Sequence, residues 1–100
     1  MALRINPRLL NESFDYYELE KEDAWASPTY KEPITVEKVR MDQVPNGIIA
    51  FTYASDTTPF IKFKRRSKIV TKNGTYTINK VVNINEPFQD KVWSIELELI

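Results

Sequence analysis

The sequence contains no cysteine and no histidine. Without cysteine, neither a disulfide framework nor a thiolate metal site is possible. Without histidine, the commonest general base and metal ligand are missing, together with every Ser–His or Cys–His nucleophile arrangement. We therefore expect no enzyme, no catalytic residue, no metal site and no cofactor.

An excess of charge of either sign is also missing, since 14 basic residues balance 14 acidic ones. A general nucleic-acid binder usually has a clearly basic domain, so this balance argues against that class. Residues 1–10 lack the long apolar core of a signal peptide, and no segment approaches the length of a membrane span. These absences by themselves predict a cytoplasmic location.

The strongest local signal lies in residues 68–85, KIVTKNGTYTINKVVNIN. Asn73 and Gly74 separate two runs rich in Ile, Val, Thr and Tyr, which is typical of a hairpin with a type I′ turn. With these two residues as the turn, the register pairs Ile69 with Ile78. One mainly apolar face is then shared by Ile69, Thr71, Tyr76 and Ile78.

Residues 34–41, ITVEKVRM, change their hydrophobic phase partway along. Ile34 and Val36 share one phase, whereas the apolar residues that follow them share the other. This change predicts a β-bulge or sharp bend near Glu37–Lys38, as small barrels use at their corners.

Other segments also have extended character. Residues 9–19 fit both a helical and an alternating spacing, and we favour a strand because Phe, Tyr, Asn, Ser and Asp are poor or middling helix formers. Residues 47–54 and 91–100 are predicted strands, the second with a regular alternation of apolar and polar residues. Residues 21–28 are interpreted as a polar loop that contains Trp25.

Together these segments predict an all-β fold. Five or six short, mainly antiparallel strands at intervals of roughly ten residues, without a helical period, are typical of a sandwich or barrel. At this size we favour a small closed β-barrel, because closure removes unprotected edges. Residues 1–100 are expected to form this single domain, with residues 1–8 as an N-terminal arm.

A basic run, KFKRRSK, occupies residues 62–68 and contains no acid. One interpretation is a contact with DNA phosphates or with another subunit. The other is a solvated strand edge, which is the usual outcome for such runs. The candidate residues are Lys62, Lys64, Arg65, Arg66 and Lys68.

An acidic segment, residues 12–23, has the opposite charge. An acidic end and a basic end on a neutral domain would suit a head-to-tail contact between copies, which closes into a ring when the rotation allows. Trp25 either folds back on the core or anchors a partner. The candidate interface residues are Glu18, Glu20, Glu22, Asp23 and Trp25.

Short pieces along the whole chain resemble one known group of proteins, the minor capsid or head–tail connector proteins (head-closure type) of tailed phages and prophages of Gram-positive bacteria. Their order and spacing carry the resemblance. The pieces are RINPRLL (4–10), DAW (23–25), TY (29–30), EP (32–33), VRMD (39–42), PF (59–60), FK (63–64), SKI (67–69), YTI (76–78), EP (86–87) and IELEL (95–99).

The resemblance implies a small β-barrel that forms a ring under the portal, closes the packaged capsid and offers a platform for the tail. It implies a virion location after assembly in the host cytoplasm, and no catalytic residues. Its implied partners are other copies of the chain, portal- or adaptor-side proteins, tail-side proteins and packaged DNA in the channel.

The sequence departs from that family at one place. Members carry a longer polar insertion after the position of Asp42, where a long loop can help to block the DNA channel. Here only residues 43–46 separate two predicted strands. This departure shifts any DNA contact toward residues 62–68.

A rival interpretation is a free-standing nucleic-acid-binding barrel of the OB or SH3-like kind. Residues 62–68 would then contact the backbone, and Tyr53 and Phe51 could stack on bases, although Phe51 also suits the core. The balanced net charge favours the first interpretation over this one.

Overall fold

The computed structural model describes residues 11–23, 26–87 and 91–100, so the predicted N-terminal arm lies outside the described residues. The described part contains strands and no helix, which confirms the all-β prediction. The strands are β1 (Glu12–Tyr17), β2 (Leu19–Asp23), β3 (Ala26–Tyr30), β4 (Ile34–Val44), β5 (Gly47–Tyr53), β6 (Lys68–Thr71), β7 (Gly74–Asn85) and β8 (Val92–Leu99).

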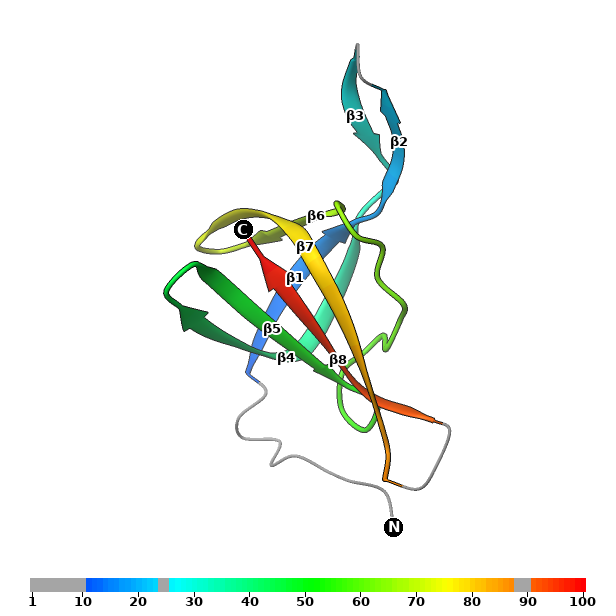
Figure 1. Ribbon diagram of the computed structural model, residues 1–100, viewed down its shortest axis with the longest axis vertical. Helices are drawn as coiled ribbons and strands as arrows, with labels where there is room; N and C mark the ends of the chain where they lie inside the picture. The colour runs from blue at the N-terminus through cyan, green and yellow to red at the C-terminus, as the bar shows by residue number, and fades with distance from the viewer. Residues whose placement is uncertain (1–10, 24–25, 88–90) are drawn as a thin grey trace.

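Six of these strands close into an antiparallel barrel in the order β1-β4-β5-β8-β7-β6 (Figure 1). Its interior is filled by side chains that alternate along the strands, as in β8, where Ile95, Leu97 and Leu99 are buried and Glu96 and Glu98 are half-buried. The alternation predicted for residues 91–100 is confirmed over this part. It ends at Ser94, which is buried although its neighbours in sequence predict an outward position.

The hairpin β6–β7 forms where predicted, but the predicted turn is wrong. Thr71 pairs with Gly74, so the two turn residues are Lys72 and Asn73, and Ile69 pairs with Tyr76 instead of Ile78. Of the described non-glycine residues only Lys38 and Arg66 have positive φ, which excludes a type I′ turn at Lys72–Asn73. Asn-Gly therefore occupies the last two positions of the turn and not its centre.

A second hairpin, β4–β5, repeats this arrangement. Val44 pairs with Gly47 across Pro45 and Asn46. Asn46 and Gly47 therefore occupy the last two turn positions, as Asn73 and Gly74 do in the β6–β7 turn. Both glycines have a φ of 150°, a conformation that L-residues rarely adopt.

The bend in β4 is confirmed at the predicted place. Glu12 pairs with Val39 and Ser13 pairs with Glu37, so Lys38 is the extra residue of a β-bulge, with a φ of 59°. Because of this extra residue, Val36 and Val39 both point into the core and both are fully buried.

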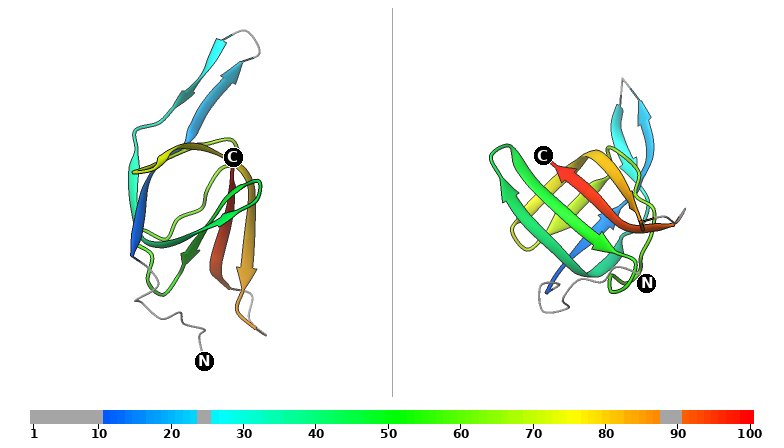
Figure 2. Two further views of the ribbon diagram at one scale, coloured as in Figure 1. Left: turned by 90° about the vertical axis from the view of Figure 1, so that its left-hand side faces the viewer. Right: turned by 60° about the horizontal axis from the view of Figure 1, so that its bottom comes forward.

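Residues 12–17 form a strand as favoured, whereas the predicted loop at residues 21–28 is wrong for the described part. There, β2 and β3 form a separate two-stranded sheet, here called the projecting hairpin, which pairs Leu19 with Tyr30 and Asp23 with Ala26. It extends away from one end of the barrel (Figure 2), and the molecule measures 49 × 29 × 27 Å.

Candidate functional site

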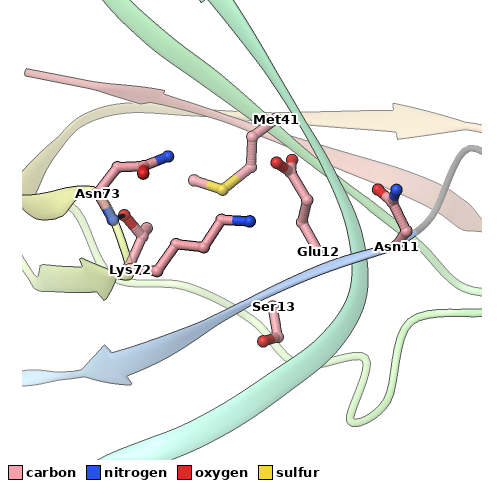
Figure 3. Close-up of a pocket in the computed structure, with 7 residues that line it drawn as sticks. Asn11, Glu12, Ser13, Met41, Lys72 and Asn73 are labelled. Carbon is pink, nitrogen blue, oxygen red and sulfur yellow. Dashed lines mark hydrogen bonds between the residues drawn. The ribbon is translucent and has the colours of Figure 1, made fainter.

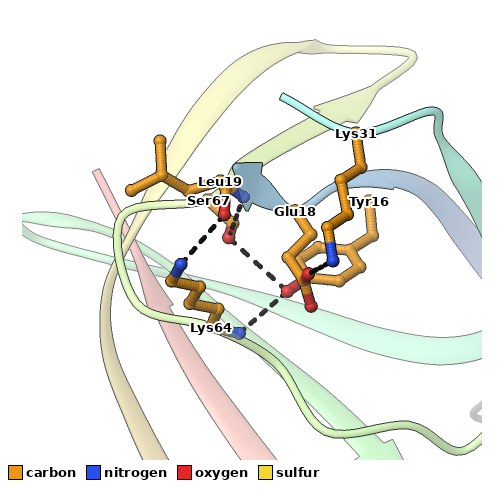
Figure 4. A network of polar contacts seen from close by, with 6 residues as sticks. All are labelled: Tyr16, Glu18, Leu19, Lys31, Lys64 and Ser67. Carbon is orange, nitrogen blue, oxygen red and sulfur yellow. Dashed lines mark hydrogen bonds and ion pairs between the residues drawn. The ribbon is translucent and has the colours of Figure 1, made fainter. Parts of the chain in front are cut away.

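A polar network joins the base of the projecting hairpin to the barrel (Figure 4). The buried hydroxyl group of Tyr16 accepts a hydrogen bond from the backbone N–H of Lys64 at 2.8 Å. The hydroxyl group of Ser67, also buried, accepts one from the backbone N–H of Leu19 at 2.9 Å. The side-chain ammonium of Lys64 also binds Leu19, donating a hydrogen bond to its backbone carbonyl at 3.0 Å. The loop that enters β6 is thereby held to the start of β2.

An ion pair closes the two ends of the projecting hairpin. The ammonium of Lys31, just after β3, lies 2.7 Å from the carboxylate of Glu18, just before β2. The hydrogen bond from Lys31 holds the pKa of the Glu18 carboxyl below its ordinary value. The same bond raises the pKa of Lys31. Both side chains remain partly exposed, so the pair orients the hairpin more than it stabilises the fold.

Two further cations of the basic run contact the hairpin. The guanidinium of Arg66 lies 3.1 Å from the carboxylate of Glu22. The ammonium of Lys68 lies 4.4 Å from the ring centre of Tyr17 and 4.8 Å from that of Tyr30, in cation–π range of both. Both basic side chains therefore act within their own chain.

The acidic and basic segments accordingly meet at one end of the molecule. The expectation of an acidic end opposite a basic end is wrong, because Lys64, Arg66 and Lys68 all bind the projecting hairpin or the strand that leads into it. Arg65 points elsewhere and donates to the carbonyl of Asn79 at 2.8 Å. Lys62 is exposed and makes no hydrogen bond or ion pair with the described residues.

The acidic candidates divide in the same way. Glu18 and Glu22 are engaged inside the chain, whereas Glu20 is exposed on β2. Trp25 and the side chain of Asp23 lie outside what the structure describes.

Two adjoining hollows that share Asn83, here together called the β7 groove, lie beside residues 79–83 of β7, with residues 60–65 on their other side. Its apolar floor includes Phe60, Ile61, Val92 and Ile95. Its basic residues are Lys62, Arg65 and Lys80. No acidic residue is among the described residues that line it.

A smaller hollow of about 140 Å³ lies between the start of β1 and the β6–β7 turn (Figure 3). The side chains of Glu12, Met41 and Lys72 point into it. Within residues 11–23, 26–87 and 91–100, no group of three or more His, Cys, Asp or Glu residues is arranged to hold a metal ion. In that same part of the chain, no helix is long and apolar enough to cross a membrane.

Tyr53 and Phe51, the residues that the rival nucleic-acid interpretation assigns to base stacking, already pack against other side chains of the chain. Tyr53 is 4% exposed, and its ring stacks on Trp93 at 5.3 Å between centroids. Phe51 is half-buried with the guanidinium of Arg40 over its ring at 4.8 Å. Base stacking by Tyr53 would require this aromatic pair to separate.

Sequence reasoning missed Tyr16, Lys31, Ser67 and Lys80. Tyr16 and Ser67 read as ordinary strand and loop residues, and Lys31 lies in a segment without periodicity. Lys80 gave a usable signal, because a charged residue in a strand of Ile, Val and Asn marks an outward position. Nothing local shows that it lines a hollow adjoining the one that Lys62 lines.

Comparison with known proteins gives one match. The family model described as "Minor capsid protein" matches residues 7–99, nearly the whole chain. Neither the curated proteins nor the solved structures contain a match.

Proposed function

Because the chain belongs to the minor capsid protein family of phages, whose members have a structural role in the virion, we propose that it is a head–tail connector subunit. In this proposal, copies of the chain form a ring under the portal, close the packaged capsid and provide a platform for the tail. The ring is assembled in the host cytoplasm and contacts portal- or adaptor-side proteins above and tail-side proteins below.

The observation that carries this proposal is the projecting hairpin. Two strands of five residues each extend beyond the barrel, and a hairpin of two strands is at best marginally stable in water by itself. An element of this kind is well suited to contact a neighbour in an assembly. The barrel supplies a rigid body, and the hairpin reaches outside it.

Fewer residues are proposed for contacts in the assembly than the sequence suggested, because several of the candidates bind within their own chain. Glu20, Lys62 and Arg65 are exposed and remain proposed contact residues, for a neighbouring subunit or, for the two basic residues, packaged DNA. Asp23, the last residue of β2, and Trp25, two positions after it, remain proposed interface residues on sequence grounds.

Deleting the gene from a phage or inducible prophage that carries it tests the proposal. We expect separate heads and tails in electron micrographs, with restored tailed particles when the gene is supplied in trans. In wild-type particles, antibody labelling should place the protein at the head–tail junction. Infectious tailed particles from the deletion strain, or labelling over the capsid shell alone, would refute the connector role.

A further inference from the structure

In the described part of the chain, one edge of β7 is paired by a neighbouring strand over only part of its length. β7 has twelve residues, whereas its neighbour β6 has four and pairs only with Gly74–Thr77. Ile78 exchanges backbone hydrogen bonds with Arg66 and Ser67. In the part of the chain that the structure describes, no backbone hydrogen bond joins residues 60–65 to residues 80–85 of β7.

Residues 54–67 run along the outside of the barrel, from the end opposite the projecting hairpin to its base (Figure 1). They pass beside the unpaired edge of β7, with the β7 groove between the two segments. At Arg65 and Asn79 the groove adjoins a further hollow at the hairpin base, whose lining includes Leu19, Tyr30 and Ile100. An unpaired strand edge beside such a groove is a template for an added chain.

The charges of the groove and of the projecting hairpin are complementary. The groove presents Lys62, Arg65 and Lys80, and the side chain of Lys80 is 64% exposed with only a long contact of 3.9 Å to Glu98. β2, with the sequence LEKED, has three acids against one lysine. β2 is therefore an acidic strand, and the β7 groove is a basic site beside a free strand edge.

We propose that the projecting hairpin of one copy docks, through β2, into the β7 groove of the next copy, with Glu20 against Lys62 and Lys80. This inference rests on the proposed ring. A hairpin cannot fill the groove of its own chain, because it points away from the barrel along the long axis. The two surfaces differ, so the contact is heterologous and repeats from copy to copy until the ring closes.

DNA is the other occupant that a basic groove could take. The floor of the groove argues for protein, since Phe60, Ile61, Val92 and Ile95 offer apolar surface and a phosphate backbone gains nothing from it. Exposed ion pairs are individually weak, at about 0–1 kcal/mol. Docking therefore becomes effective when a preformed neighbouring ring raises the effective concentration of subunits.

Disulfide trapping tests the contact directly, because the native chain has no cysteine. Glu20→Cys combined with Lys80→Cys is oxidised at high protein concentration and analysed on a non-reducing gel. We expect a ladder of multimers that a reductant removes, whereas each single variant gives dimers at most. The matched control combines Glu20→Cys with Thr75→Cys, an exposed residue near the β6–β7 turn. A ladder no stronger than that of this control overturns the docking.

Charge exchange in the phage separates the possible occupants. Lys62→Glu with Lys80→Glu should lower incorporation into virions, Glu20→Lys should do the same, and the triple variant should recover. All three residues are exposed, so thermal unfolding of the purified variants should be unchanged. If the groove variant alone loses incorporation and Glu20→Lys does not, DNA or another partner occupies the groove and the inference fails.

The same experiment distinguishes this inference from the connector role. Wild-type protein at the head–tail junction together with full incorporation of all the charge variants refutes the docking and leaves the connector role intact. Absence of the wild-type protein from the junction refutes both.

Discussion

Arg66 and Glu22 form an ion pair within one chain, with Nη1 of the arginine 3.1 Å from both carboxylate oxygens, although 44 positions separate the residues. Arg66 makes this contact from a left-handed backbone conformation, with a φ of 70°. Both side chains are largely exposed, and an exposed pair contributes only about 0–1 kcal/mol. The pair therefore sets the direction of the projecting hairpin more than it stabilises the barrel.

Ser67→Ala is expected to lower the free energy of unfolding by about 1–3 kcal/mol, because it leaves the buried backbone N–H of Leu19 without an acceptor. Urea unfolding measures the loss, and the Leu19 amide should exchange its hydrogen faster. Ser27→Ala, on the exposed surface of β3, is the matched control and should stay within about 0.5 kcal/mol of the native chain. Equal effects of the two changes would show that the Ser67 hydroxyl does not hold the hairpin.

Gly47→Ala should cost more stability than Gly74→Ala. Both glycines have a φ of 150°, so each substitution strains the backbone, by about 1–3 kcal/mol. At position 47 the added Cβ would also overlap the carbonyl oxygen of Leu99. At position 74 its nearest neighbour is the hydroxyl oxygen of Tyr76, at an ordinary contact distance of 3.8 Å. Chemical denaturation of the two variants gives the order, and a larger loss for Gly74→Ala would contradict the packing of the β4–β5 turn against β8.

Lys38 is the bulge residue of β4, and its φ of 59° predicts opposite outcomes for two substitutions. Lys38→Gly should keep or raise the melting temperature, because glycine has no Cβ to clash in the left-handed region. Lys38→Val should destabilise the protein by about 1–2 kcal/mol, since a β-branched residue resists that conformation. Glu37→Val, one position earlier on the exposed surface, serves as the control for added hydrophobicity.

The Glu18–Lys31 pair predicts a contribution to acid sensitivity. The pKa of Glu18 is lower in the folded chain than its ordinary value, so the group stabilises the fold at pH values above its unfolded pKa of about 4.3. This contribution is lost as the pH falls through that value and then through the folded pKa. Lys31→Met should therefore flatten the acid side of the stability curve.

Carbon-detected NMR titration of Glu18 checks the same prediction at the residue itself. In Lys31→Met the pKa of Glu18 should rise toward its ordinary value, because the hydrogen bond from Lys31 is the largest cause of the lowering. The variant Lys21→Met, at an exposed lysine of β2, should change it little. An unchanged pKa in Lys31→Met would mean that the ion pair is not populated in solution.

Much of the barrel follows from local patterns in the sequence. Strands with one buried face can be recognised from alternating apolar and polar residues, as in β8, because successive side chains on a strand point to opposite faces. The bulge at Lys38 is visible for the same reason: an extra residue shifts the hydrophobic phase. The lack of histidine and cysteine is likewise a property of composition alone.

The register of β6 and β7 could not be determined in this way. The predicted pairing and the observed one differ by two residues, and a shift of two leaves every side chain on the same face. Ile69, Tyr76 and Ile78 therefore satisfy both registers equally well. Only the twist and closure of the whole barrel decide which turn type connects the strands.

The sequence by itself determined the all-β class, most strand positions and the faces that form the core, because these depend on side-chain alternation and turn residues a few positions apart. The tertiary structure alone decided that residues 19–30 include two strands, that Arg66 meets Glu22, and that Lys62 and Lys80 line two adjoining hollows along β7. Those relationships join segments far apart in the chain. The charge and polarity of each residue are compatible with many contacts between distant segments. Closure of the barrel determines which of these contacts form.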